Sequence, residues 1–214
     1  MKLYVYNHCP HCIKARLVAD ISGLKYETVY LANDDEKAHI DKIGSKQVPF
    51  LELDYGTFIK ESRDVCEYIA KIQNFKIEGA SDNTYLANKL NGLADHNRKV
   101  IYPRMPHNTK NACDFPTQSA KEYFLDKKAL YIGDMSDLLI NPPNDSITAI
   151  NETLASIDSQ VQFPFINGDK LSWDDVYLFP ILFILTMAKE IIVIPTNIKK
   201  YIHNIEKNTN IELY

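Results

Sequence analysis

The chain has 214 residues, which suits one or two domains and allows a core that folds without disulfides or metal. It carries 24 Lys and Arg against 28 Asp and Glu, and this net charge of −4 argues against nucleic acid or an anionic membrane surface as the main partner. Two of its four cysteines are close in sequence, a pattern that excludes a secreted disulfide scaffold.

The first 72 residues alternate between short β-rich runs and helical patterns. Strands are expected over residues 2–6, 26–31, 48–53 and 57–60, and helices over residues 13–21, within 33–43 and from 62 to 72. Ser62 is expected to cap the last of these helices, because serine is favoured at that position. The order β-α-β-α-β-β-α predicts an α/β domain in which helices cover a mixed sheet.

Helical periodicity dominates the rest of the chain. Residues 73–84 collect Gly, Ser, Asp and Asn and follow no period, and we interpret them as a linker. The linker would join a domain over residues 1–72 to an all-helical domain over residues 85–214. Within the second domain, Ser172 and Asp175 are expected to open a helix as its cap and first turn.

The longest apolar stretch covers residues 176–188 and includes Pro180. A membrane span needs about 20 apolar residues, so we expect these 13 to form a buried central helix instead. At the N-terminus, four apolar residues separate Lys2 from Asn7, fewer than the roughly 7–15 of a signal peptide. We therefore expect a cytoplasmic protein with no membrane association, whose thiols are kept reduced.

A Cys-Pro-His-Cys motif at residues 9–12 lies between the first strand and the first helix. A helix N-terminus favours the reactive thiolate through its free N–H groups and its dipole. Pro10 suits the first helical turn, where its missing N–H costs nothing. The arrangement predicts Cys9 as the exposed nucleophile and Cys12 as the resolving thiol one turn later.

Two histidines flank these cysteines. An imidazolium at His11 would favour the Cys9 thiolate, whereas His8 is expected to be an exposed loop residue with little effect. Half of a zinc site is the alternative interpretation of the motif. It would require a second CxxC or a spaced histidine pair, which the sequence does not contain, so we expect no metal.

Two further dipeptides could contribute to a binding site. A proline at a strand start, as in Val48-Pro49, can mark a cis bond that exposes the preceding backbone to an extended peptide. Ser62 at a helix start offers a hydroxyl and free N–H groups to a carboxylate, and Glu61 can receive an ammonium. Each dipeptide alone is common, as an edge proline or a helix cap.

The other cysteines and nearby charges are not expected to take part in chemistry. Cys66 lies on the apolar face of the third helix and is expected to be an inert core thiol. Cys113 is expected in a loop. Lys14, Arg16 and Lys46 are interpreted as solvated or anion-attracting charges without a defined role.

Taken together, these motifs resemble the glutaredoxin 2 family, bacterial glutaredoxins with a glutathione-transferase-like fold. The resemblance covers nearly the whole chain. It rests on the sequences MKLYVY at 1–6, CPHC at 9–12, KQVPF at 46–50, Glu61-Ser62, KEYFLDKK at 121–128 and LSWDDVYLFP at 171–180.

The resemblance implies a thioredoxin-like domain followed by a helical domain, with glutathione as the reducing substrate and no other cofactor. It also implies a cis bond before Pro49 and pairing of Val48 with the glutathione backbone. Glu61 and Ser62 would hold the γ-glutamyl end, and His11 would lie against the tripeptide.

His11 departs from the family pattern, which usually has tyrosine between the cysteines. CPHC also occurs in strongly oxidising periplasmic thiol oxidases. Such an oxidase has a potential of about −120 mV, compared with roughly −200 to −230 mV for glutaredoxins. We hypothesise that His11 shifts this protein towards the oxidising side.

The expected function is glutathione-dependent thiol–disulfide exchange by a monomer acting on disulfide-containing or glutathionylated proteins. A glutathione transferase is one alternative, but it would not need a dithiol. A non-catalytic interaction protein on the same fold is another, but it could lose Cys9 and Ser62. The combination of Cys9, Cys12, Pro49 and Ser62 argues against both.

Overall fold

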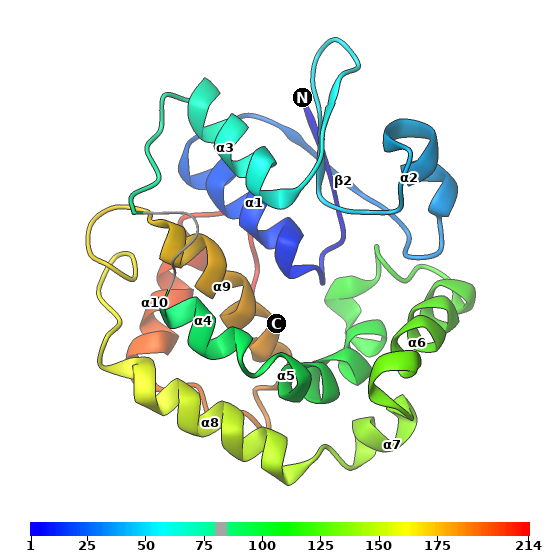
Figure 1. Cartoon of the computed structure of the whole chain (residues 1–214), viewed down its shortest axis with the longest axis vertical. Helices are drawn as coiled ribbons and strands as arrows, with labels where there is room; N and C mark the ends of the chain where they lie inside the picture. Colours follow the sequence, from blue (N-terminus) through cyan, green and yellow to red (C-terminus); the bar gives the residue numbers. More distant parts are fainter. Residues whose placement is uncertain (80–84) are drawn as a thin grey trace.

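The first part of the chain forms a four-stranded sheet with three helices (Figure 1). The computed structural model describes residues 1–79 and 85–214. In chain order the elements are β1 (Lys2–Val5), α1 (Pro10–Ile21), β2 (Glu27–Tyr30), α2 (Glu36–Ile43), β3 (Phe50–Glu52), β4 (Phe58–Ile59) and α3 (Ser62–Ile72). The predicted order β-α-β-α-β-β-α is confirmed, with strands one to three residues shorter than expected.

The sheet is mixed, with the strand order β2-β1-β3-β4. β1 runs parallel to β2 and antiparallel to β3, and β4 pairs antiparallel with β3. Successive side chains of β1 point to opposite faces. Leu3 and Val5 join the main core with α1 and α3, whereas Tyr4 and Tyr6 pack with Ile43 of α2. Both faces of the sheet are therefore covered.

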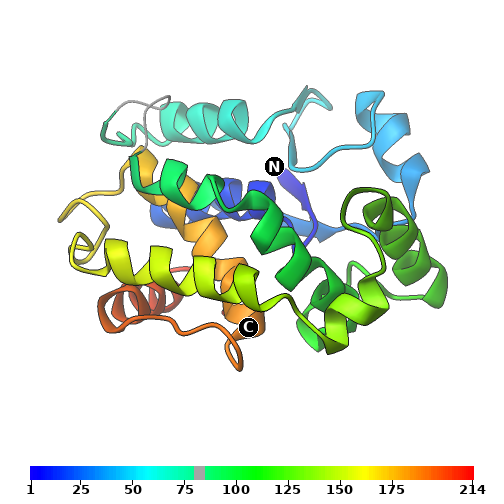
Figure 2. The same ribbon diagram turned by 60° about the horizontal axis from the view of Figure 1, so that its bottom comes forward.

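The second part of the chain is helical (Figure 2). Its elements are α4 (Tyr85–Asn91), α5 (Ala94–Ile101), the 3-10 helices η1 (Tyr102–His107) and η2 (Thr109–Asn111), α6 (Gln118–Ile132), α7 (Met135–Ile140), α8 (Asn144–Asp158), α9 (Trp173–Leu185), the 3-10 helix η3 (Thr186–Ala188) and α10 (Thr196–Lys207). Together with the sheet, these helices confirm the predicted fold class, an α/β thioredoxin-like part followed by an all-α part.

Helix α9 is the buried central helix expected from the apolar stretch, and it packs against α1 and α4. Ser172 and Asp175 form a capping box at its start. The fully buried Asp175 carboxylate also accepts hydrogen bonds from the Ile166 N–H at 2.8 Å and the Tyr201 hydroxyl at 2.9 Å. Burial raises the pKa of Asp175, and these donors act against that rise.

The predicted linker is described only in part, since residues 80–84 lie outside the described residues. Glu78 on the described side pairs its backbone with Leu171 and Trp173, so this end of the segment lies against the start of α9. Within residues 1–79 and 85–214, no helix is long and apolar enough to cross a membrane.

Candidate active site

Cys9 occupies the N-cap position of α1, with Pro10 as the first helical residue. The Cys9 carbonyl accepts the first helical hydrogen bonds, from the N–H groups of Cys12 at 3.0 Å and Ile13 at 3.1 Å. Both cysteines are free thiols; Cys9 is half-buried and Cys12 is fully buried. The start of α1 therefore leaves the Cys9 thiol partly exposed and buries the Cys12 thiol beneath it.

The two thiols have opposite acidities. A hydrogen bond from the Cys12 thiol lowers the pKa of Cys9 to about 6, although burial opposes the effect. Three further contributions also lower the pKa of Cys9: the charge of His11, the charge of His8 and a hydrogen bond from the Cys12 backbone N–H. Burial raises the pKa of Cys12, and its bond to Cys9 raises it further. At neutral pH, Cys9 is therefore the thiolate and Cys12 is the thiol.

A hollow of about 680 Å³ opens beside Cys9 and is also lined by His11, Gln47 and Val48. The Val48–Pro49 peptide bond is cis, as the resemblance implied. Val48 is half-buried, and its backbone N–H and C=O have no hydrogen-bond partner within the described part of the chain. These groups are therefore free to pair with a peptide-like ligand lying beside Cys9.

Glu61 and Ser62 stand next to this hollow but outside its lining. The prediction that Ser62 caps this helix is wrong by one residue, because Glu61 is the N-cap and Ser62 begins α3. Glu61 has a φ of 65°, a left-handed value that costs about 1–3 kcal/mol for a residue other than glycine. Its Oε1 accepts a hydrogen bond from Gln47 Nε2 at 3.2 Å, and the Ser62 hydroxyl lies 3.4 Å from His11 Nδ1. These contacts bring Glu61 and Ser62 to residues that line the hollow beside Cys9, namely Gln47 and His11.

His8 is not the exposed loop residue that the sequence predicts. Its side chain is buried, and its Nδ1 lies 2.7 Å from Oδ2 of Asp114. The ring stacks on Tyr6 at 5.4 Å and on Phe115 at 5.0 Å between centroids. His8 is therefore a fixed part of the site whose charge acts on Cys9.

Asp114 is the residue that sequence reasoning missed. Its fully buried carboxylate also accepts the backbone N–H groups of Asn7 at 2.9 Å and His8 at 3.0 Å. Its backbone carbonyl accepts the N–H of Asn33 at 2.7 Å. One residue of the helical part thus holds the loops before α1 and α2. No periodicity or motif around Asp114 in the sequence could have indicated this role.

The three charges that were interpreted as solvated have defined positions. Lys46 donates from Nζ to the Asn33 carbonyl at 2.6 Å. Arg16 is buried and donates to Asn7 Oδ1 at 3.1 Å and to the Asn210 carbonyl at 2.8 Å, so its expected exposure is wrong. Lys14 is half-buried over the Tyr177 ring, 4.1 Å from its centroid. Cys66 is a buried thiol whose pKa burial raises to about 12, as expected of an inert core residue.

Within residues 1–79 and 85–214, no group of three or more His, Cys, Asp or Glu side chains is placed to hold a metal ion. The ionisable groups that meet at Cys9 instead form a thiol–imidazole arrangement. Such an arrangement can supply a thiolate for attack on a disulfide, with a second thiol in reach to resolve the product.

The two parts of the chain match two family models. Residues 3–76 match the N-terminal domain of glutathione S-transferases, and residues 86–214 match the C-terminal domain of glutaredoxin 2. The second match alone covers more than half of the chain.

Full-length relatives give the same result. The chain is 33% identical to glutaredoxin 2 of Escherichia coli strain K12, over 100% of this chain and 97% of the relative. Glutaredoxin 2 from Salmonella typhimurium, solved in complex with glutathione, has a TM-score of 0.89 and 31% identity, covering 99% of this chain and 95% of that one.

More distant structures share the fold alone. Glutathione transferase GSTFuA3 from Phanerochaete chrysosporium has a TM-score of 0.73 at 15% identity, covering 99% of this chain and 98% of that one. The relatives at 31–33% identity, together with the match over residues 86–214, identify the family. This chain belongs to the glutaredoxin 2 family.

Proposed function

We propose that this protein is a glutathione-dependent thiol–disulfide oxidoreductase that uses Cys9 as its nucleophile and Cys12 as its resolving thiol. The observation that carries the proposal is the Cys9 thiol at the start of α1, with its pKa lowered to about 6 by Cys12 and with a hollow beside it. The family relatives named glutaredoxin 2 support the same activity.

In the first step, the Cys9 thiolate attacks the glutathione sulfur of a mixed disulfide. A bond forms between Cys9 and that sulfur, the original S–S bond breaks, and the other thiol leaves as a thiolate that takes up a proton. A second glutathione then attacks the glutathione sulfur bound to Cys9. This step releases glutathione disulfide and restores the Cys9 thiolate.

A protein disulfide follows a second route. After Cys9 has attacked one of its sulfurs, Cys12 loses its proton and attacks Cys9, which releases the reduced protein and leaves a Cys9–Cys12 disulfide. Two glutathione molecules then reduce this disulfide and become one molecule of glutathione disulfide. The high pKa of Cys12 keeps it protonated until it is needed.

Glutathione would bind along the groove beside Cys9. The free Val48 N–H and C=O would pair with its backbone, next to the His11 ring. Glu61 would receive its ammonium and Ser62 its α-carboxylate, at the start of α3. The complex of the Salmonella typhimurium relative with glutathione supports this ligand for the present chain.

The partners and setting follow from the same chemistry. Glutathionylated and disulfide-bonded proteins are the proposed substrates, and the cytoplasm is the proposed compartment, since it keeps thiols reduced. The four free cysteines support this setting. We propose that the protein acts as a monomer, with no nucleic-acid or membrane partner.

The test is the glutathione-dependent reduction of a mixed disulfide by wild type, Cys9→Ser and Cys12→Ser. Cys9→Ser is expected to be inactive, whereas Cys12→Ser should still remove glutathione from a mixed disulfide. Cys113→Ser, which changes an exposed thiol, is the matched control and should resemble wild type. Glutathione conjugation to an electrophile that survives Cys9→Ser would instead indicate a transferase.

A further inference from the structure

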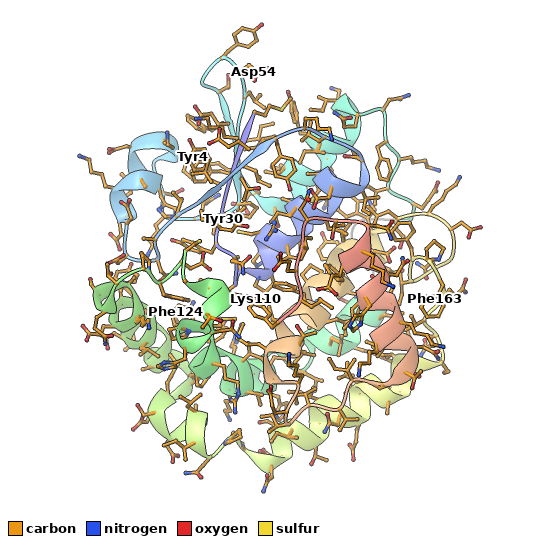
Figure 3. All side chains as sticks on the ribbon, turned by 180° about the vertical axis from the view of Figure 1, so that it is seen from behind. Tyr4, Tyr30, Asp54, Lys110, Phe124 and Phe163 are labelled. Carbon is orange, nitrogen blue, oxygen red and sulfur yellow. The ribbon has the colours of Figure 1, made fainter. Side chains whose placement is uncertain are left out.

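The hollow beside Cys9 has a second wall, which α6 of the helical part provides. Lys127 and Lys128 on α6 line it, as do the aromatic rings of Tyr102, Tyr123 and Phe124. Figure 3 labels Phe124, which lies in the helical part and packs its edge against the His8 ring at 5.4 Å. Neither lysine has a role in the binding of the first glutathione proposed above.

Aromatic rings hold the ammonium groups in place. Lys127 Nζ lies 5.2 Å from the Tyr123 ring centroid, and Lys128 Nζ lies 5.3 Å from that of Tyr102 and 5.8 Å from that of Phe124. Lys46 reaches the same hollow from the sheet side, 3.7 Å from the Tyr123 ring. Cation–π contacts of this kind orient a cation without neutralising it.

No ion pair with a carboxylate is formed by Lys46, Lys127 or Lys128 within the described residues. The nearby Glu36 carboxylate accepts a hydrogen bond from the Tyr123 hydroxyl and attracts Lys46 and Lys127 without forming an ion pair. Asp34 attracts Lys46 in the same way, so two carboxylates face three ammonium groups. Lys128 faces the positive charge of Arg98 as well as the thiolate charge of Cys9. The wall therefore carries a net positive charge.

Partial burial makes the charges of Lys46 and Lys128 costly, whereas Lys127 is exposed at the mouth of the hollow. Desolvation lowers the pKa of Lys46 to about 8 and also lowers the pKa of Lys128. An anion bound between them would offset this cost, because opposite charges attract more strongly where water is partly excluded. The geometry thus indicates a ligand that carries negative charge on the side of Cys9 that faces α6.

We propose that Lys127 and Lys128 form a subsite for the leaving half of the disulfide and select a small leaving thiol that carries a carboxylate. This proposal rests on the proposed function, because the leaving half exists only if Cys9 attacks a disulfide. In-line attack by Cys9 requires the leaving sulfur on the far side of the glutathione sulfur, and in this proposal that half of the disulfide enters the part of the hollow lined by Lys127 and Lys128. The same ammonium groups stabilise the negative charge that develops on that sulfur.

The test uses three mixed disulfides that share the glutathione half and differ in the charge of the leaving thiol. The leaving thiols are 3-mercaptopropionate, which is anionic, 2-mercaptoethanol, which is neutral, and cysteamine, which is cationic. Two ratios of kcat/KM are measured. The anionic-to-neutral ratio compares the 3-mercaptopropionate and 2-mercaptoethanol substrates, and the cationic-to-neutral ratio compares the cysteamine and 2-mercaptoethanol substrates. The three leaving thiols also differ in intrinsic reactivity, but this difference cancels when the ratio for a variant is divided by the ratio for wild type.

In the double variant Lys127→Met/Lys128→Met, the anionic-to-neutral ratio is expected to fall about fivefold or more relative to wild type, and the cationic-to-neutral ratio is expected to rise. Raising the salt concentration should lower the wild-type anionic ratio in the same direction. Methionine keeps an unbranched apolar stem on each position.

Two controls separate charge from folding. Lys127→Arg/Lys128→Arg keeps both charges and should keep the wild-type ratio. Lys89→Met removes a lysine that lies over another tyrosine, 4.9 Å from the Tyr85 ring centroid, and should also keep that ratio. An anionic ratio that stays unchanged in the double methionine variant overturns the subsite alone. Failure of wild type to turn over any of the three substrates contradicts the proposed function itself.

Discussion

The two walls of the groove beside Cys9 are built differently. The sheet side contributes short local segments: the backbone of Val48 lies in the groove wall, and the turn at Glu61 and Ser62 stands next to it. The helical part contributes side chains: the lysines and aromatic rings of α6 line the groove, and the buried Asp114, outside the lining, holds the loop that carries Cys9. Backbone groups suit any peptide-like ligand, whereas side chains set the charge that the groove prefers and the position of the loop that carries Cys9.

In the helical part, the largest effect is expected when the buried Asp114 carboxylate is removed. Asp114→Ala deprives three donors on Asn7 and His8 of their acceptor, and the two on His8 are buried, so we expect the free energy of unfolding to fall by about 3–5 kcal/mol. Urea titration measures the change. Asp126→Ala, at an exposed position of α6, should change it by less than about 0.5 kcal/mol. A loss of about 1 kcal/mol or less for Asp114→Ala would show that this residue does not hold the loop.

The sheet side is tested at Ser62. Loss of a hydrogen bond to a charged group costs about 1.5 kcal/mol or more, so Ser62→Ala should raise the KM for glutathione about tenfold and change kcat little. Steady-state kinetics at varied glutathione concentration measure both constants. Ser156→Ala is the control, because that hydroxyl donates only to the Thr153 carbonyl of its own helix. A KM within twofold of wild type would remove Ser62 from the binding site.

A smaller effect is expected from His11, which lines the hollow from the first turn of α1. The His11 charge contributes to the low pKa of Cys9, so His11→Tyr should raise that pKa and make the reduced form less stable. We expect the reduction potential to become more negative by about 10–30 mV, where 30 mV is a tenfold change in the equilibrium constant. Redox titration against glutathione measures it, with His203→Tyr on α10 as the control. An unchanged potential would refute the role of His11.

Local sequence patterns predicted the parts of the fold that depend on neighbouring residues. The apolar stretch after Ser172 and Asp175 became α9 with its capping box, and the CPHC motif became the start of α1. Each of these depends on residues within one or two helical turns. The resemblance to a family added the cis bond before Pro49, which residue types alone leave open.

Sequence reasoning failed where distant residues decide the outcome. His8 is buried because Asp114, 106 residues away, accepts its Nδ1–H, and no pattern in either segment indicates that contact. Arg16 is buried through Asn210, which is 194 residues away. The cap of α3 was misplaced because Glu61 adopts a left-handed φ that its residue type disfavours. The contacts between the two parts of the chain were therefore the hardest to predict.

The central claim is that Cys9 is a thiolate at neutral pH because Cys12 donates a hydrogen bond to it. The most direct measurement is the rate of alkylation of Cys9 by iodoacetamide between pH 4 and about 10, with modified peptides identified by mass. Since a lowered thiol pKa leaves the thiolate present above that pKa, the wild-type rate should be half-maximal near pH 6, and Cys12→Ala should shift the midpoint upwards. A wild-type midpoint near the ordinary thiol pKa of about 8.5, unmoved by Cys12→Ala, would contradict the account.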